Sequence, residues 1–211
     1  LYGVTGSGKS EVFLRCAEAV IAQGKAVIYL VPEITLTHQL AQQVSSRFAN
    51  KVAILHSALT PSQRLKEWKR IIAGEVNLAI GARSAVFAPF ENLGLIILDE
   101  EHENSYKSGN TPRYHARQVA QRRCQQEGAT LVMGSATPSL EAYSLMQDGT
   151  QVGALHLTKR VAGGSMPAVE VVNLALEKSL VSAALKQGIK ATLDKKKQVI
   201  LFLNRRGFSY F

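Results

Sequence analysis

Residues 3–10 read Gly-Val-Thr-Gly-Ser-Gly-Lys-Ser and stand directly before an apolar run with helical spacing. Two glycines separated by four residues and followed by Lys9 and Ser10 match the pattern of a phosphate-binding loop. Glycines let the backbone turn tightly and bring its N–H groups close to phosphate oxygens, and the N-terminus of a following helix favours negative charge. The stretch predicts a nucleoside triphosphate site. An ordinary Gly/Ser turn before a helix is the alternative.

The residues of this loop have separate predicted roles. Lys9 is expected to reach the β- and γ-phosphates as a mobile positive charge, and the Ser10 hydroxyl to ligate Mg²⁺. The residues expected to bind the nucleotide are Gly3, Thr5, Gly6, Ser7, Gly8, Lys9 and Ser10.

Short β-branched runs alternate with segments of 3.6-residue period along most of the chain. Strands are predicted at residues 26–31, 51–55, 76–81, 93–99 and 130–134. Each is apolar almost throughout, as a strand covered on both faces must be. Two helical stripes are predicted to be core, namely Leu36, Leu40, Val44 and Phe48, and then Leu65, Trp68 and Ile72. This alternation predicts an α/β fold with a mostly parallel sheet flanked by helices.

The character of the chain changes after about residue 149. Residues 163–167 read as a linker or turn, and a strand at 169–172, a helix at 182–193 and a strand at 198–203 would open a second α/β lobe. We therefore predict a first lobe over residues 1–150, a transition region over 151–180 and the start of a second lobe over 181–211. Both ends look cut, which suggests a piece of a longer protein.

Composition restricts the partners and the compartment. The 211 residues carry 25 Lys and Arg against 16 acidic residues, a net charge of +9 that suits a polyanionic partner. The alternative is a basic surface that serves only solubility. No long apolar run or secretory leader is present, so we expect no membrane partner and a cytoplasmic location. Cys16 and Cys124 lack metal-ligand spacing and are expected to be small core residues.

An acidic tetrad, Asp99-Glu100-Glu101-His102, follows the apolar strand predicted at residues 93–99. The carboxyl edge of a parallel sheet would place it beside the phosphate loop. Asp99 is then expected to hold Mg²⁺ through water, and Glu100 to orient and polarise the water that attacks the γ-phosphate. Acidic residues that cap a helix N-terminus are the alternative.

The phosphate loop, the acidic tetrad and the later Ser135-Ala136-Thr137 resemble, in this order and spacing, motifs I, II and III of superfamily 2 helicases. More narrowly, the chain is similar to the PriA-like family of bacterial replication-restart helicases. The segments that carry this likeness are residues 31–37, 81–85, 99–106, 134–140 and 204–207. The resemblance spans nearly the whole chain.

The resemblance implies two RecA-like lobes and a DNA-dependent ATPase that uses ATP and Mg²⁺ and moves 3′ to 5′. Implied partners are single-stranded and forked DNA, primosome proteins and single-strand-binding proteins, in a bacterial, nucleoid-associated setting. Zinc is expected only in a cysteine-rich region downstream of this chain, and this piece alone is expected to hydrolyse little ATP. Residues His102, Ser135 and Thr137 would couple the nucleotide state to the hold on DNA. A hydrogen-bonded structural histidine is the alternative for His102.

Residues 32–37 are expected to form a loop and a helix N-terminus that hold phosphodiester oxygens through backbone N–H groups and the Thr35 and Thr37 hydroxyls. Arg83 is expected to add a charged contact, with a salt bridge inside its loop as the alternative. Ala82 stands where the family pattern has Thr, which removes one possible hydroxyl contact.

The segment between Glu103 and Arg117 (residues 104–116, the aromatic segment) is polar but contains aromatic residues. It resembles the loop with which PriA-like and RecQ-like helicases sense single-stranded DNA. Tyr106 and Tyr114 would offer stacking surfaces and Lys107 backbone attraction. A loop held by buried tyrosines is the alternative.

These observations predict an ATP-dependent DNA helicase motor. Two other classes stay open: another superfamily 2 translocase or RNA remodeller, and a nucleic-acid-binding scaffold whose nucleotide site does not turn over. Glu100 argues against the scaffold, because a site that only binds has no need to orient a water.

Overall fold

A computed structural model describes residues 1–33, 35, 36, 38–49, 51–149, 152–163, 167–177 and 181–202. The chain divides into two compact units, Leu1–Gly164 and Ser165–Phe211.

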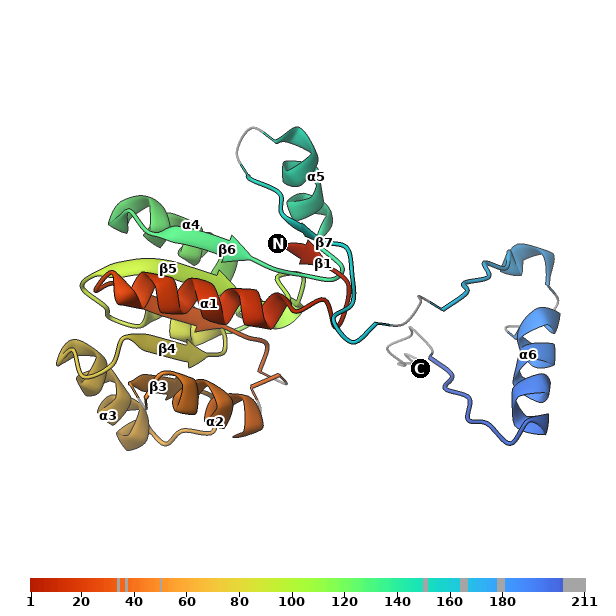
Figure 1. Cartoon of the computed structure of the whole chain (residues 1–211), viewed down its shortest axis with the longest axis horizontal. Helices are drawn as coiled ribbons and strands as arrows, with labels where there is room; N and C mark the ends of the chain where they lie inside the picture. The colour runs from red at the N-terminus through yellow and green to blue at the C-terminus, as the bar shows by residue number, and fades with distance from the viewer. Residues whose placement is uncertain are drawn as a thin grey trace. The chain divides into compact units, whose positions relative to one another are not determined.

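The first unit is built on a five-stranded parallel sheet in the order β3-β4-β2-β5-β6 (Figure 1). Its strands are β2 (Ala26–Leu30), β3 (Val52–Leu55), β4 (Leu78–Gly81), β5 (Leu93–Leu98) and β6 (Thr130–Met133). Strand β1 (Tyr2–Gly3) pairs in parallel with β7 (His156–Leu157), and the Gly3 N–H donates to the Ser135 carbonyl at 3.2 Å, just beyond β6. The prediction of a mostly parallel α/β fold is confirmed.

Helices cover both faces of this sheet, which explains why its strands are apolar throughout. On β2, Val27 and Tyr29 pack on one side with helices α1 (Lys9–Ala22) and α2 (His38–Arg47). Ile28 and Leu30 pack on the other side. That layer holds α3 (Pro61–Ile72), α4 (Ala116–Glu127) and the 3₁₀ helix η1 (Arg83–Phe87).

One of the two predicted helical stripes is correct throughout. Val44 is buried, and Leu36, Leu40 and Phe48 pack against the same cluster. Of the stripe predicted on α3, only Trp68 packs against the core. Leu65 and Ile72 are 56% and 62% exposed, so their prediction as core residues is wrong. Helix α3 lies mainly against β3, the edge strand, and buries Ile71 instead, because one narrow side of the helix suffices to cover an edge.

The remaining elements of the first unit lie near the carboxyl ends of the strands. They are the 3₁₀ helix η2 (Asn104–Tyr106) and helix α5 (Leu140–Asp148). Gly134 follows β6 at a close approach to α1: a Cβ atom there would lie 2.2 Å from Cζ of Phe13.

The second unit contains η3 (Leu174–Leu176) and helix α6 (Ala183–Asp194), whose N-cap Ser182 accepts from the Leu185 N–H at 3.1 Å. The helix was predicted, but the strands expected at 169–172 and 198–202 are not formed. A strand needs a partner, and residues 167–177 and 181–202 supply none. Predicted linker residues 164–166 and the motif at 204–207 lie outside the described residues. Every helix of the described part is too short or too polar to cross a membrane.

Candidate nucleotide site and its surroundings

Two predicted halves of a nucleotide site meet in one pocket at the carboxyl edge of the sheet. The pocket has a volume of about 590 Å³. It is lined by Thr5, Gly6, Ser7, Gly8, Lys9, Ser10, Glu11, Asp99, Glu100 and Val161. Asp99 and Glu100 directly follow β5, and the phosphate loop follows β1, whose Gly3 bonds to Ser135 just beyond β6. This arrangement at the carboxyl edge brings together groups about 90 residues apart.

The phosphate loop presents donors to this pocket. Gly6 and Gly8 have φ values of +78° and +90°, which favour glycine, and Gly8 caps α1 without a side-chain acceptor among the described residues. Lys9 is buried, and its Nζ donates to the Gly3 carbonyl at 2.8 Å. Ser7 Oγ is buried with no hydrogen-bond partner within the described part of the chain. An uncapped helix start, a lysine and an unpaired hydroxyl fit a polyphosphate.

Val161 closes one side of the loop. Its N–H donates to the Gly6 carbonyl at 2.9 Å, and the pairing of β7 with β1 brings this part of the chain back to the phosphate loop. No motif in the sequence marked Val161, because an isolated valine carries no signal for a contact 155 residues away in the chain.

Asp99 is held in place by two hydrogen-bond donors. Oδ1 accepts from the Glu100 N–H at 2.9 Å, and Oδ2 accepts from the Tyr29 hydroxyl at 3.1 Å. Burial, followed by the charge of Glu100, raises the pKa of Asp99, and the hydrogen bonds from Tyr29 and the Glu100 N–H and the charge of Lys9 oppose this only in part. A bound cation would favour the ionised carboxylate. The hydroxyl of Ser10 and the carboxylate of Asp99 are the hard oxygen ligands that Mg²⁺ prefers, so the residues fit this ion.

Glu100 itself sits in an unusual backbone conformation. Its φ of +46° lies in the left-handed region, which costs a non-glycine residue about 1 kcal/mol or more. Backbone strain of this kind concentrates at functional sites, and here it accompanies the residue expected to orient water.

Glu11 adds negative charge to the same pocket, and arginines neutralise it. Its carboxylate accepts from Arg47 at 2.6 Å and from Arg15 at 2.8 Å, which lowers the pKa of Glu11 to about 2. Arg47, in the last turn of α2, also binds Glu18 at 2.6 Å. This network was not predicted, because the sequence does not show that α2 ends beside α1.

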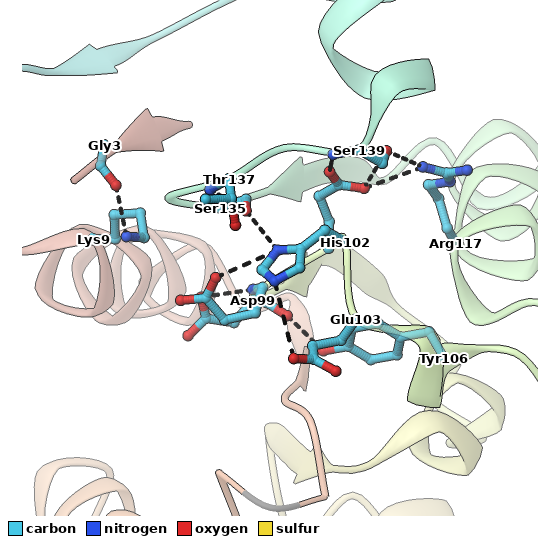
Figure 2. Close-up of polar contacts among 12 residues, drawn as sticks. Gly3, Lys9, Asp99, His102, Glu103, Tyr106, Arg117, Ser135, Thr137 and Ser139 are labelled. Carbon is cyan, nitrogen blue, oxygen red and sulfur yellow. Dashed lines mark hydrogen bonds and ion pairs between the residues drawn. The ribbon is translucent and has the colours of Figure 1, made fainter. Parts of the chain in front are cut away.

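The three residues expected to couple nucleotide and DNA lie together. His102 Nδ1 is 2.7 Å from Ser135 Oγ, and the Thr137 N–H donates to the same oxygen at 2.9 Å (Figure 2). His102 also lies 3.7 Å from a carboxylate oxygen of Glu100. His102 is therefore hydrogen-bonded, as the structural alternative requires, and the partner is the predicted motif III serine.

Glu101, the third residue of the tetrad, was given no role, yet its side chain is 2% exposed and fully engaged. Its carboxylate accepts from the Ser139 N–H at 2.6 Å, the Ser139 hydroxyl at 3.1 Å and Arg117 at 3.1 Å. Its burial could not be read from the sequence, where it is one of three consecutive acids.

The residues predicted to contact DNA differ in exposure and in their partners. Thr35 is exposed, and Thr37 lies outside the described residues. Arg83 donates to the Ser105 carbonyl at 3.1 Å and to the Lys107 carbonyl at 2.6 Å. These acceptors are backbone carbonyls, so neither the salt-bridge alternative nor a free arginine describes Arg83; it ties η1 to the aromatic segment.

The aromatic segment contains one correction. Tyr106 is 0% exposed, and its hydroxyl donates to the Asp99 carbonyl at 2.6 Å, so its prediction as a stacking surface for DNA is wrong. An apolar ring next to a buried strand is pulled into the core rather than left in solvent. Lys107 is exposed, and Tyr114 is half-buried, with its ring 5.0 Å from that of Phe87 and 5.8 Å from the Arg83 guanidinium carbon.

Comparison with solved structures places the first unit among RecA-like helicase domains. The structure of RecG bound to a three-way DNA junction matches with a TM-score of 0.50 and 25% identity, over 69% of this chain and 18% of that one. The helicase MrfA matches with a TM-score of 0.56 and 18% identity, over 97% of this chain and 33% of that one, which shows the fold alone.

Two curated relatives cover the whole chain. Replication restart protein PriA of Treponema pallidum is 59% identical over 210 residues, and that of Bacillus subtilis is 47% identical over 216 residues. The chain spans 32% and 27% of the length of these relatives. The family model for DEAD/DEAH box helicases matches residues 1–145. With the phosphate loop, the acidic tetrad and this match in agreement, the chain belongs to the DEAD/DEAH box helicase family.

Proposed function

We propose that this chain is the ATP-hydrolysing motor part of a DNA helicase that acts in replication restart. The observation that carries the proposal is the meeting of Lys9 and Ser10 with Asp99 and Glu100 around one pocket. The family supports the helicase class, and the curated PriA relatives support replication restart as its setting.

In this proposal each group at the pocket has a separate task. Backbone N–H groups of residues 6–10 and the Lys9 ammonium bind and orient the polyphosphate of ATP. Ser10 and Asp99 hold Mg²⁺, which when bound supplies positive charge to the phosphate oxygens. Tyr29 and the Glu100 N–H orient the Asp99 carboxylate. Glu100 orients the attacking water and accepts its proton.

The DNA side of the proposal concerns the same sheet edge. Thr35, Thr37 and Lys107 would contact the backbone of single-stranded DNA, and Tyr114 would stack on a base. Arg83 would act by holding the aromatic segment rather than by reaching a phosphate.

The wider setting follows the relatives. We propose 3′ to 5′ movement, single-stranded and forked DNA as substrates, and primosome and single-strand-binding proteins as partners, in the bacterial cytoplasm near the nucleoid. The RecG neighbour, solved on a three-way DNA junction, supports a branched substrate. Tailed duplexes with a 3′ or a 5′ single strand test the direction, since only one of them would be unwound.

The function is tested by steady-state ATP hydrolysis of the full-length gene product, with and without forked DNA and with and without Mg²⁺. We expect a DNA-dependent rate that Lys9→Ala abolishes, because a buried phosphate ligand is lost. Lys69→Ala, an exposed lysine on α3, is the matched control and should hydrolyse as the unmodified protein does.

Other outcomes point to other classes. Stimulation by RNA but not by DNA would favour an RNA remodeller. ATP binding without turnover would favour the scaffold. Hydrolysis that survives Lys9→Ala would contradict the site itself.

A further inference from the structure

Two consecutive residues of the acidic tetrad hold the two ends of residues 135–139. His102 Nδ1 lies 2.7 Å from Ser135 Oγ at the start, and Glu101 accepts from the Ser139 N–H at 2.6 Å at the end. The Glu101 N–H also donates to the Gly134 carbonyl at 3.0 Å. Thr137 lies between these anchors, so its position depends on both.

Arg117 links the same carboxylate to the aromatic segment. It lies in the first turn of α4, directly after that segment. One of its terminal nitrogens donates to Glu101 at 3.1 Å and to Ser139 Oγ at 3.0 Å (Figure 2). The backbone N–H of Arg117 donates to His115 Nδ1 at 3.2 Å. A shift in the start of α4 therefore changes the contacts of both Glu101 and Ser139.

Burial stabilises the contacts among Glu101, Arg117 and Ser139, which together form the connection between the aromatic segment and residues 135–139. Glu101 is 2% exposed and Arg117 20% exposed at the side chain, so water cannot readily replace a lost hydrogen bond. A buried carboxylate left without its arginine is strongly unfavourable, which favours joint movement of the partners over separation. Ser139 also caps α5 by accepting from the Ala142 N–H at 3.2 Å, so α5 is included in the connection.

We propose that Glu101 is a positioning residue that transmits the state of the aromatic segment, through Arg117 and Ser139, to residues 135–139. This inference rests on the proposed helicase function, because it assigns to Glu101 the coupling of DNA binding to ATP hydrolysis. Glu101 touches neither nucleotide nor DNA in this role.

The first test is Glu101→Gln in the full-length gene product, with ATP hydrolysis measured over a range of single-stranded DNA concentrations. Glutamine keeps the size of the side chain but places an amide donor against the donors of Arg117 and Ser139. We expect nucleotide affinity and the rate without DNA to stay within about twofold, while the stimulation by DNA falls about 2- to 30-fold.

Glu127→Gln is the matched control. Glu127 also pairs with an arginine of α4, Arg123 at 2.7 Å, but it lies at the opposite end of the helix and outside the connection. The stimulation of ATP hydrolysis by DNA in Glu127→Gln should equal that in the unmodified protein. Ser139→Ala, which removes the hydroxyl and leaves the Glu101–Arg117 pair, provides a second variant if Glu101→Gln does not fold.

A second readout does not depend on hydrolysis. Hydrogen exchange of the amides at residues 135–142 is followed with and without an oligo(dT) strand, in the absence of nucleotide. We expect the strand to change exchange there in the unmodified protein and to leave it unchanged in Glu101→Gln, while exchange in β2 and β5 stays constant in both.

The possible results distinguish a failure of the proposed helicase function from a failure of the inference about Glu101. An unmodified protein without DNA-stimulated hydrolysis contradicts the proposed function, and the exchange experiment still decides the connection. Full stimulation in the Glu101 and Ser139 variants, or an oligo(dT) strand that never alters exchange at residues 135–142, overturns the inference.

Discussion

The buried hydroxyl of Tyr106 gives a sharp prediction for stability and activity. Tyr106→Phe keeps the ring in the core but removes the 2.6 Å hydrogen bond to the Asp99 carbonyl. Loss of one partner of a buried hydrogen bond costs about 1–3 kcal/mol. For a domain of this size, that loss lowers the melting temperature by about 2–12 °C. Tyr106→Ala also creates a cavity, and costs of about 3–5 kcal/mol are typical for such a deletion.

The assay is urea unfolding of the 211-residue chain, followed by fluorescence of Trp68, its single tryptophan. Trp68 packs against the same core cluster as Tyr106, so its signal reports on the right layer. Tyr143→Phe on α5 is the control: Tyr143 is 47% exposed, and its variant should stay within about 0.5 kcal/mol.

The same variants distinguish positioning from stacking. Tyr106→Phe removes a hydrogen bond to Asp99 but keeps the ring, so it should keep its affinity for single-stranded DNA and hydrolyse ATP more slowly. Tyr106→Ala removes the ring; a ring that lies in the core makes no contact with DNA, whereas a stacking ring would be needed for DNA affinity. An unchanged unfolding midpoint in both variants together with weaker DNA binding in Tyr106→Ala would refute the argument from burial.

Three further predictions concern single positions. Gly8→Ala should destabilise the chain by about 1–2 kcal/mol and weaken MgATP binding, because φ is +90° and the new Cβ would lie 3.2 Å from Val161. Urea unfolding measures the loss of stability, and titration with a fluorescent ATP analogue measures the loss of binding. Burial, followed by the charge of Arg117, lowers the pKa of His115 from 6.5, so the folded chain favours the neutral ring. The neutral ring therefore contributes to the free energy of unfolding above about pH 6.5, and this contribution is lost as the pH falls. The urea midpoint should therefore drop more between about pH 7.5 and 5.5 than in His115→Asn, and equal drops would contradict this. Burial raises the pKa of the Cys124 thiol to about 11, so iodoacetamide should leave Cys124 unmodified in the native chain, as peptide mass mapping would show.

Local sequence patterns were sufficient to predict the phosphate loop and the strands of the parallel sheet. Residues 3–10 predicted their loop because all their functional atoms come from neighbouring residues, and the strand before Asp99 was recognisable because coverage on both faces requires an apolar run. Parallel pairing then implied that Asp99 would lie beside Lys9, as the pocket has it. The strand predicted at 198–203 is wrong over the described residues 198–202, since a strand exists only with a partner.

Spacing along the chain determined which residues could bind phosphate and metal, since those ligands come from short segments at the ends of strands. Only tertiary packing decided that Tyr106 is buried under Asp99, that Arg83 holds carbonyls of the aromatic segment, and that Glu101 joins Ser139, 38 residues away. The physical reason is that a polar or aromatic side chain can lie in solvent or in the core. Which of the two it does depends on hydrogen-bond and packing partners that are distant in the sequence.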